Sequence, residues 1–380
     1  MNRDPRIFAA PSATIFLTGV TGFLGGAFLA QLIDDGFDGE VVCLVRAQTL
    51  ECARERVRKS LARFGHNHVP KWVRVLPGDV TGDAWHTAPE LNAVTHTLHL
   101  AASTSFGTEE SVFRTNVDGA MSVARSMRGR NLERYLHTGT ATICGAQPPN
   151  IVHENDYPHP DAVHLVAYTK SKAEAETELA KRYGDLPVVV ARPSIVVGHT
   201  QAGCAPSGSI FWVLRVVEAL RFLAWNRTNR VDVVPVDWVA GALKYLLFAP
   251  DLQYDRYHLS AGDSSAVRWD EIEAEAARVY GGPARGRYEV GSLRDLTRQR
   301  VREAIPDCQP RHLMLALELY ARFCSLDLIF DNSRILREGV APPPRFTDYM
   351  RVCLESSPAS IYEQMRTDFE SSSTPVEVPA

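Results

Sequence analysis

The sequence predicts an α/β fold with a doubly wound parallel sheet, followed by a smaller and mostly helical carboxy-terminal lobe. Short apolar, β-branched runs alternate with helical patterns over the first 200 residues, and the alternation stops beyond Gly198. A glycine-rich turn joins the first strand to the first helix. Alternating strands and helices form a parallel sheet with helices on both faces, because each helix crosses over the sheet between two strands.

The predicted elements follow one another along the chain. Strands are expected at 14–18, 40–45, 72–76, 95–100, 134–138, 187–192 and 256–260. Helices are expected from the glycine-rich turn to Gly36 and over 49–64, 109–128 and 168–184. Beyond Gly198 we expect a helix over 209–223, a short strand that runs into a helix over 231–248, and mostly helix from 262 to about 325.

Three glycines, Gly19, Gly22 and Gly25, lie three residues apart between the first strand and the first helix. In a Rossmann-type dinucleotide-binding turn, the first glycine permits a tight turn and the second lets the backbone approach a diphosphate. The third lets the helix pack on the strand, and the diphosphate lies at the positive helix N-terminus. The cofactor contacts expected here are Gly19, Thr21, Gly22, Phe23, Leu24 and Gly25.

The end of the second strand indicates which dinucleotide binds. NAD-specific domains place Asp or Glu there to accept a hydrogen bond from the ribose 2′-hydroxyl. In this chain the position holds Arg46, 21 residues beyond Gly25, with no carboxylate beside it. A guanidinium suits a 2′-phosphate by charge and by its paired donors. NADPH is therefore the expected cofactor, and Arg56 is either a second cation for the phosphate or a solvated helix residue.

Further cofactor contacts are expected where the third and fourth strands end. Asp79 and Val80 follow the third strand, where a carboxylate can accept a hydrogen bond from the adenine amino group. A turn residue is the alternative role for Asp79. The fourth strand ends in "HLAAST" (99–104), whose small side chains, Ala101 among them, leave room for the cofactor.

Tyr168 and Lys172 lie four residues apart, which places them on one helix face. Tyrosine has an ordinary pKa of about 10, and a neighbouring ammonium is expected to lower it by stabilising the phenolate. Lys172 can also reach the nicotinamide ribose. A third hydroxyl that holds a substrate carbonyl is expected at the end of the fifth strand, where the spacing alone leaves Thr138, Thr140 and Thr142 open.

Several motifs together resemble extended short-chain dehydrogenases/reductases. They are "TGVTGFLGG", the Tyr-x-x-x-Lys of "YTKSK", "RPSIVVG" (192–198) and "VPVDWVA" (234–240). "LTGVTGFLGG" followed by "VVCLVRAQTLECARERVRKSL" is similar to the thioester-reductase branch, which includes fatty acyl-CoA reductases and the terminal reductase domains of carboxylic acid reductases and peptide synthetases. "HLAASTSF" and "FRTNVDGA" (113–120) resemble the acyl-CoA reductase form. The resemblance covers roughly residues 12–262.

This resemblance implies roles for particular residues. It selects Thr140 as the catalytic hydroxyl, so the implied triad is Thr140, Tyr168 and Lys172. Arg46 matches the family's 2′-phosphate arginine, and Pro193 and Ser194 match the segment beside the nicotinamide. The chain departs from the family at "TGTATICG", which replaces the usual serine–threonine dipeptide.

The implied function is NADPH-dependent reduction of an acyl thioester, on CoA or on a carrier protein, to an aldehyde or an alcohol. Thr140 and Tyr168 would donate to the developing oxyanion, with Tyr168 as the general acid. No adenylation or carrier segment is recognisable, so the acyl group is expected to arrive preactivated. The alternatives are an NADP-dependent ketone or aldehyde reductase or dehydrogenase with the same triad, and a non-catalytic NADP-binding regulator.

The predicted elements and the family resemblance together imply a domain organisation. Residues 12–200 are expected to form the NADP-binding domain, to which the strand and helix of 231–262 return. The substrate lobe is expected to comprise 201–230 and 263–368, and 369–380 to be a disordered tail. Phe211, Trp212, Leu214 and residues 313–323 are the expected acyl contacts. The apolar stripe 312–330 is expected to be a core helix, with an acyl tunnel or a membrane-surface contact as alternatives.

Composition excludes several other classes of protein. The net charge of −4 and the lack of a basic stripe argue against nucleic-acid binding. Seven scattered cysteines without a CxxC pair indicate neither a disulfide framework nor a zinc site, which favours a cytoplasmic protein with reduced thiols. No metal-ligand spacing surrounds His137, His153 or His164, so these are expected to be ordinary polar residues and no metal is expected. No signal peptide or transmembrane segment is expected.

Overall fold

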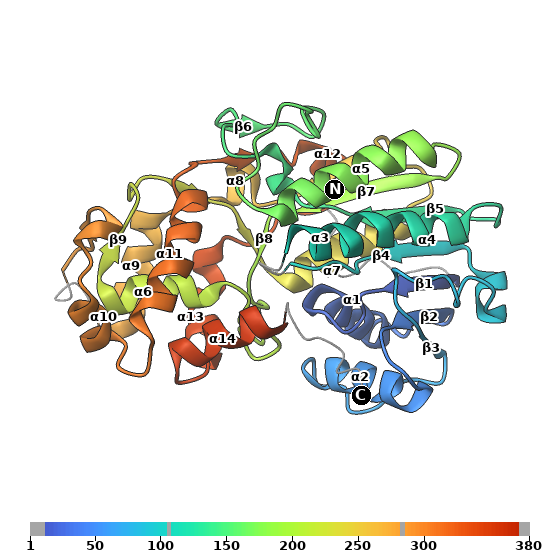
Figure 1. Ribbon diagram of the computed structural model, residues 1–380, viewed down its shortest axis with the longest axis horizontal. Helices are drawn as coiled ribbons and strands as arrows, with labels where there is room; N and C mark the ends of the chain where they lie inside the picture. Colours follow the sequence, from blue (N-terminus) through green and yellow to red (C-terminus); the bar gives the residue numbers. More distant parts are fainter. Residues whose placement is uncertain (1–11, 105–107, 282–285, 372–380) are drawn as a thin grey trace.

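The computed structural model describes residues 12–104, 108–281 and 286–371. A seven-stranded sheet, all of whose strands are parallel, lies at the centre of one half of the molecule (Figure 1). The strands are β1 Thr14–Thr18, β2 Glu40–Val45, β3 Val73–Pro77, β4 His96–His99, β5 Arg134–Thr138, β7 Val188–Pro193 and β12 Arg256–Leu259. Each predicted strand is present, and no end is displaced by more than one residue.

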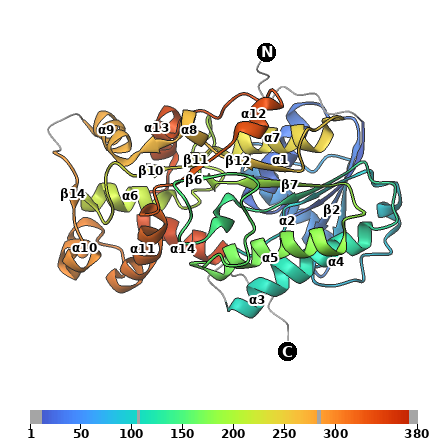
Figure 2. The same ribbon diagram turned by 90° about the horizontal axis from the view of Figure 1, so that it is seen from above.

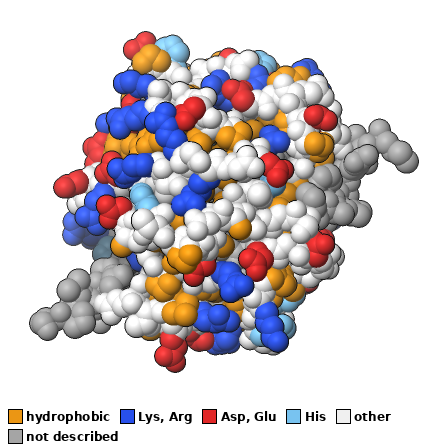
Figure 3. Space-filling model, turned by 90° about the vertical axis from the view of Figure 1, so that its right-hand side faces the viewer, with side chains coloured by type: hydrophobic (Ala, Val, Ile, Leu, Met, Phe, Trp, Pro, Cys, Tyr) orange, Lys and Arg blue, Asp and Glu red, His pale blue; other side chains and the backbone are white. Residues whose placement is uncertain are grey.

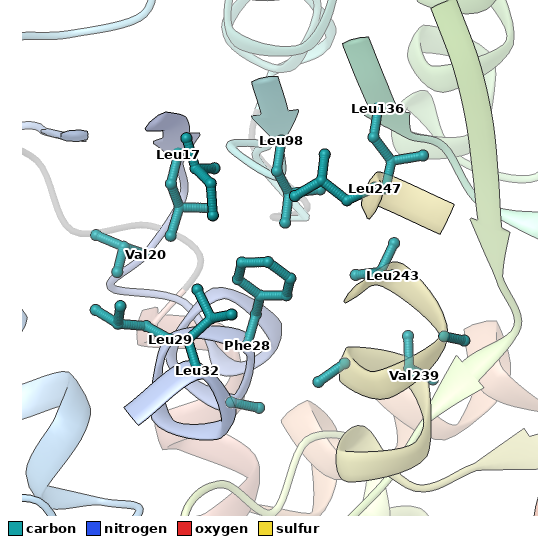
Figure 4. Packing of buried hydrophobic residues seen from close by; sticks show 14 of the residues in the cluster. Leu17, Val20, Phe28, Leu29, Leu32, Leu98, Leu136, Val239, Leu243 and Leu247 are labelled. Carbon is teal, nitrogen blue, oxygen red and sulfur yellow. The ribbon is translucent and has the colours of Figure 1, made fainter. Parts of the chain in front are cut away.

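Helices cover both faces of this sheet, as Figure 2 shows. On one face lie α1 Phe23–Asp34, α2 Leu50–Ala62 and α7 Val236–Phe248, and on the other lie α4 Gly119–Met127 and α5 Ala167–Arg182. Figure 4 shows the apolar contact between the sheet and the first of these layers, where Leu17, Leu98 and Leu136 of neighbouring strands meet Phe28 of α1 and Leu243 of α7. The predicted doubly wound α/β class is therefore confirmed.

The order of the strands creates a crevice at one end of the sheet. Running across the sheet, the order is β3, β2, β1, β4, β5, β7 and β12, so the chain reverses its direction of travel between β1 and β4. Thr18 and His99 are register partners at the carboxyl ends of these two strands. Open α/β sheets bind ligands outside the strand ends at such a reversal. The glycine-rich turn and the "HLAAST" segment both begin there.

Most of the remaining helices gather at the other end of the molecule (Figures 1 and 2). They pack through a second apolar cluster and comprise α6 Phe211–Leu220, α9 Trp269–Tyr280, α10 Arg298–Ala304, α11 Pro310–Cys324, α13 Phe346–Ser356 and α14 Ile361–Ser371. Two short parallel pairs lie between the halves: β8 Ile195–Val196 with β11 Val233–Val234, and β6 Ile151–Val152 with β15 Ile329–Phe330. Helix α14 ends inside the predicted tail 369–380, and the rest of that tail lies outside the described residues.

Two predicted helices differ in detail from those observed. The helix expected over 109–128 consists of α3 Glu109–Phe113, a π-helical turn Arg114–Asp118, and α4. The helix expected over 209–223 ends at Leu220, because Arg221 adopts a left-handed conformation with a φ of 51°. The residues that follow form β9 Phe222–Leu223, which pairs with β14 Glu289–Val290 instead of continuing the helix.

Charged side chains of both signs are interspersed over the face shown in Figure 3. Among the described helices, none combines the length and the hydropathy that a bilayer crossing requires.

Candidate active site

Close backbone contacts shape the glycine turn after β1. Gly19 has a φ of 77°, and a Cβ atom added to it would lie 2.6 Å from the backbone nitrogen of Ala101. A Cβ on Gly25 would lie 2.3 Å from the carbonyl oxygen of Gly19, whereas a Cβ on Gly22 would meet only this same oxygen, at 3.2 Å. Gly19 and Gly25 thus let the turn and helix pack, and exposed Gly22 leaves the backbone open to a ligand.

Helix α1 begins with backbone donors that nothing caps. Its N-cap is Gly22, whose position provides no side-chain hydrogen bond, and its first turn contains no acidic residue. The first N–H groups of a helix, here those of Phe23, Leu24 and Gly25, have no intrahelical acceptor and form the positive end of the helix dipole. Half-buried Thr21 precedes the cap. A helix N-terminus without a side-chain cap fits the diphosphate of a dinucleotide.

Two residues of the α2 region hold the glycine turn in place. The hydroxyl of Ser60 donates to the carbonyl oxygen of Val20 at 3.0 Å, and Arg63 donates to the carbonyl oxygen of Thr21 at 2.8 Å. Neither contact could be predicted from the sequence, because both residues lie about forty positions further along the chain. A serine and an arginine on a charge-rich helix are otherwise unremarkable.

Arg46 and Arg56 lie together beyond the end of β2. The Arg56 guanidinium donates to the carbonyl oxygen of Arg46. Burial lowers the pKa of Arg56, and the neighbouring charge of Arg46 lowers it further. Glu55, the nearest acid in sequence to Arg56, is bonded to Arg58. Two adjacent cations at this strand end form an arrangement that suits a phosphate.

The residues after β3 and β4 have mixed roles. Oδ1 of Asp79 accepts hydrogen bonds from the backbone nitrogen and the hydroxyl of Thr81, both at 2.9 Å, so one carboxylate oxygen serves a turn. Val80 is buried and lies next to Gly119. The backbone nitrogen of Ala101 donates to the hydroxyl of Thr18 at 3.1 Å, which places Ala101 beside the glycine turn.

Tyr168 and Thr140 meet across the carboxyl end of the sheet. Tyr168 lies in the first turn of α5, and its hydroxyl is hydrogen-bonded to that of Thr140. The Thr140 hydroxyl also lies 2.9 Å from that of Thr142 and donates to the carbonyl oxygen of Pro193 at 3.4 Å. Strand β5 ends at Thr138, so the three threonines do not continue a strand alternation. Of the three threonines, Thr140 is therefore the one whose hydroxyl is bonded to Tyr168.

Ser194, which follows Pro193, is buried and donates its backbone N–H to the carbonyl oxygen of Leu259.

Lys172 lies one helical turn after Tyr168 and is buried. Its ammonium donates to the carbonyl oxygen of Thr138 at 2.7 Å. Burial lowers the pKa of Lys172 to about 8, while the charge of Glu176 acts in the opposite direction. The ammonium is therefore a costly buried charge close to the candidate catalytic hydroxyls.

The expectation that Lys172 lowers the pKa of Tyr168 is wrong. Burial raises the pKa of Tyr168 to about 12, and the hydrogen bond to Thr140 only partly opposes this rise. Removal of the phenol from water disfavours its charged form more than the surroundings favour it. Tyr168 is thus protonated at neutral pH, as a proton donor must be.

Two buried histidines, His99 and His137, lie next to Lys172. They are register partners on β4 and β5, and their ring centroids are 5.5 Å apart. Burial and then the charge of Lys172 lower the pKa of His99 to about 3 and that of His137 well below its usual range, so both are neutral. The expectation that His137 is an ordinary polar residue did not anticipate that it is fully buried. Within the described residues, no three metal-ligating side chains converge on a possible metal site.

A buried ion pair fixes α5 on the sheet. Arg192 of β7 bonds the carboxylate of Glu176 at 2.6 Å, and both side chains are buried. Arg192 also donates to the carbonyl oxygens of Glu154 and Tyr157. A Cβ on Gly139 would lie 2.2 Å from Oε1 of Glu176, so a side chain here would displace the carboxylate that Arg192 binds. The pair holds the helix that presents Tyr168 and Lys172.

An apolar cavity lies beside these hydroxyls, between the sheet and the helical half. Thr142, which is bonded to Thr140, forms part of its wall. Its polar lining residues Arg230 and Asp232 are already engaged, with Asp327 and with the backbone nitrogen of Ala261 respectively. The apolar lining comes mainly from β8, α6 and α11 and includes Cys144, Ile195, Val197, Phe211, Val213, Leu214, Tyr320, Phe323 and Phe330.

The expected acyl contacts are only partly present in this lining. Phe211, Leu214 and two residues of the range 313–323, Tyr320 and Phe323, line the cavity. The expectation that Trp212 belongs with them is wrong. It is fully buried on another side of α6, where its ring meets that of Tyr320 edge-on with centroids 5.2 Å apart.

Comparison with known proteins identifies the family. Residues 17–243 match the sequence family described as "Male sterility protein". The chain belongs to this family. It is 28% identical over 292 residues to the glycine betaine reductase ATRR of Emericella nidulans, covering 70% of this chain and 22% of that protein. It is 26% identical over 285 residues to the putative fatty acyl-CoA reductase CG8303 of Drosophila melanogaster, covering 63% of this chain and 52% of that protein.

Among solved structures, the chain is similar to the terminal R domain from the myxalamid PKS-NRPS biosynthetic pathway. The TM-score is 0.71 at 22% identity, and the alignment covers 91% of this chain and 90% of that one. The chain thus spans about half or less of the length of these two curated relatives, but nearly all of this reductase domain. The first two thirds of the chain thus belong to an NAD-binding family, the whole chain has the fold of these reductase domains, and the resemblance seen in the sequence is confirmed.

Proposed function

We propose that this protein is an NADPH-dependent reductase that converts an acyl thioester, on CoA or on a carrier protein, to an aldehyde or an alcohol. The observation that carries the proposal is the hydrogen-bonded pair of Thr140 and Tyr168, with Lys172 beside it, next to an apolar cavity. The relatives named as a fatty acyl-CoA reductase and a biosynthetic R domain support the thioester.

The residues that would hold NADPH are those of the crevice between β1 and β4. The turn from Gly19 to Gly25 would take the diphosphate, and Arg46 and Arg56 would take the 2′-phosphate. Asp79 retains one carboxylate oxygen outside its turn for the adenine. Ala101, Pro193 and Ser194 lie at the strand ends that border the nicotinamide in this fold. When bound, NADPH supplies the hydride that reduces the thioester carbonyl.

The protein's own groups act on the carbonyl oxygen. The hydroxyls of Thr140 and Tyr168 donate to it, so that the charge developing there is stabilised in a site with little water. Tyr168 then gives up its proton as the general acid. The ammonium of Lys172 would hold the nicotinamide ribose. The apolar cavity holds the acyl chain and keeps water from the reacting carbon.

Replacing Arg46 by alanine is expected to remove most of the preference for NADPH over NADH. A charge-assisted hydrogen bond contributes roughly 1.5–3 kcal/mol, so the preference of the parent protein should be about ten- to a hundredfold. Dissociation constants of both cofactors, measured by fluorescence titration, test this. Arg54→Ala, at an exposed position on the same helix as Arg56, is the control. Equal affinities of the parent protein for the two cofactors would refute the assignment.

A series of saturated acyl-CoA thioesters of increasing length tests the proposed function. We expect NADPH consumption accompanied by release of free thiol, with kcat/KM rising up to about fourfold per added carbon until the cavity is full, since a buried CH₂ contributes about 0.8 kcal/mol. Tyr320→Ala should move the optimum to longer chains without changing the dissociation constant of NADPH.

Other outcomes would select the competing functions. Turnover of aldehydes or ketones without any release of thiol from acyl-CoA or carrier-bound substrates would indicate a carbonyl reductase. Tight binding of NADPH with no turnover of any of them would indicate a regulator.

A further inference from the structure

An open groove runs along the helical half beside the candidate active site. One wall is a face of α11 that carries Arg311, Met314, Leu315, Glu318 and Arg322 at helical spacing. The opposite side includes Ala146 and Leu165, which lie in the segments just after the 3₁₀ turn Ala141–Cys144 and just before Tyr168. The groove therefore begins where the catalytic segments end.

Four arginines surround this groove: Arg294, Arg298, Arg311 and Arg322. In the part of the chain that the structure describes, none of their side chains forms a hydrogen bond or an ion pair, and Glu318 is the only acidic residue among those lining the groove. Other exposed arginines of the protein do pair, for example Arg128 with Asp185 and Arg268 with Asp270. The groove therefore gathers four guanidinium groups without an acidic partner among the described residues, in a protein of net charge −4.

The floor of the groove is apolar and adjoins the acyl cavity. Met314, Leu293 and Leu296 line it, and Leu315 is 59% exposed at its edge. Leu326 lines both the groove and the apolar cavity, so the two hollows are neighbours. A ligand that occupies both would combine an apolar acyl end, a largely neutral arm and an anionic end.

We propose that this groove binds the phosphate end of the phosphopantetheine arm that carries the acyl thioester. The inference rests on the proposed function, because it places the donor's acyl group in the cavity. Guanidinium groups bind phosphate through charge and paired donors, and the pantetheine portion crosses the apolar floor towards Tyr168. The same phosphate is present in CoA and on a carrier protein, so the groove would bind either donor through this shared group.

Binding of two small probes to the full chain tests the site without any turnover. 4′-Phosphopantetheine should bind about tenfold more tightly than pantetheine at low ionic strength, because each exposed guanidinium–phosphate pair adds a modest free energy. The difference should shrink as salt is added. The double variant R298E/R322E should abolish the preference, whereas Arg302→Glu, on the same helix α10 but outside the groove, should retain it. Calorimetric titration provides the measurement.

Equal binding of the two probes to the parent protein would overturn the proposal, as would a phosphate preference that survives in the folded double variant. If R298E/R322E does not unfold cooperatively, the milder pair R294Q/R311Q is titrated instead and should reduce the preference at least about threefold.

Kinetics with three donors separate this inference from the proposed function. The double variant should have a higher KM for acyl-CoA and for an acyl-carrier protein. Its KM for acyl-N-acetylcysteamine, which has no phosphate, should be unchanged. If KM rose only for acyl-CoA and not for acyl-dephospho-CoA, the groove would bind the nucleotide part of CoA, and the proposal would be overturned. Absence of turnover with all three donors in the parent protein would refute the thioester function, while the probe titration would still decide the phosphate site.

Discussion

Replacing Tyr168 by phenylalanine is expected to lower kcat by about two to four orders of magnitude, the usual contribution of a positioned general acid. The change removes the hydroxyl that bonds Thr140 and leaves the ring, so the fold and the dissociation constant of NADPH should be nearly unchanged. Steady-state kinetics and cofactor titration on the same preparation provide the measurement.

Tyr183→Phe is the matched control for this variant. Tyr183 follows the same helix, and its hydroxyl donates to the carbonyl oxygen of Met121, away from the site. Loss of that hydroxyl should lower stability slightly and leave kcat unchanged. If Tyr168→Phe kept most of the parent rate, the proton would have to come from another group.

Replacing Lys172 by methionine is expected to reduce activity and to raise stability at neutral pH. The pKa of Lys172 is about 8 in the folded protein, below its ordinary value of 10.5. The unfolded chain therefore holds a proton between pH 8 and 10.5 that the folded protein has lost. The cost of burying the charged form is complete below pH 8, and fades as the pH rises towards 10.5.

Methionine removes this cost but leaves the carbonyl oxygen of Thr138 without its donor. We expect a net increase of about 1–3 kcal/mol in the free energy of unfolding at pH 7, because one pKa unit corresponds to about 1.4 kcal/mol. The gain should shrink between pH 8 and 10.5. Urea denaturation of both proteins at pH 7 and pH 10 measures it. If the variant were less stable than the parent at pH 7, the folded protein would stabilise the ammonium of Lys172 relative to the unfolded chain, and the prediction would be wrong.

The same variant should bind NADPH about ten- to a hundredfold more weakly and turn over more slowly, because it loses the charged hydrogen bond of the ammonium to the nicotinamide ribose. Gain of stability with loss of activity is the pattern expected of a residue retained for function. Lys170→Met is the control, since the exposed ammonium of Lys170 pairs with Glu109 at the surface.

Local spacing was sufficient to predict the nucleotide-binding part of the fold. Gly19 and Gly25 are required by contacts with chain neighbours a few residues away or with the next strand of the sheet, and strand–turn–helix order is visible in a single sequence. Tyr168 and Lys172 are likewise visible because four residues span one helical turn. Thr140 could be singled out only by family resemblance, since the strand ends at Thr138 and the backbone then changes direction.

Features that depend on packing between distant segments could not be predicted in this way. His99 and His137 are buried beside Lys172 of α5, and nothing in their sequence neighbourhood predicts this. The error at Trp212 has a similar origin: α6 is apolar on most of its circumference, so the pattern cannot tell which side meets the cavity. The four groove arginines are spread over residues 294–322 and only the packing of α10 on α11 unites them.

Transfer of a labelled hydride tests the central claim most directly. The protein is incubated with a long-chain acyl-CoA and NADPH deuterated at the reactive nicotinamide carbon, and the product is analysed by mass spectrometry. Reduction of the thioester carbonyl predicts one deuterium on the former carbonyl carbon of the aldehyde, or two on that of the alcohol, with one free thiol for each acyl group reduced. Release of fatty acid and thiol without deuterium, or consumption of NADPH without release of thiol, would contradict it.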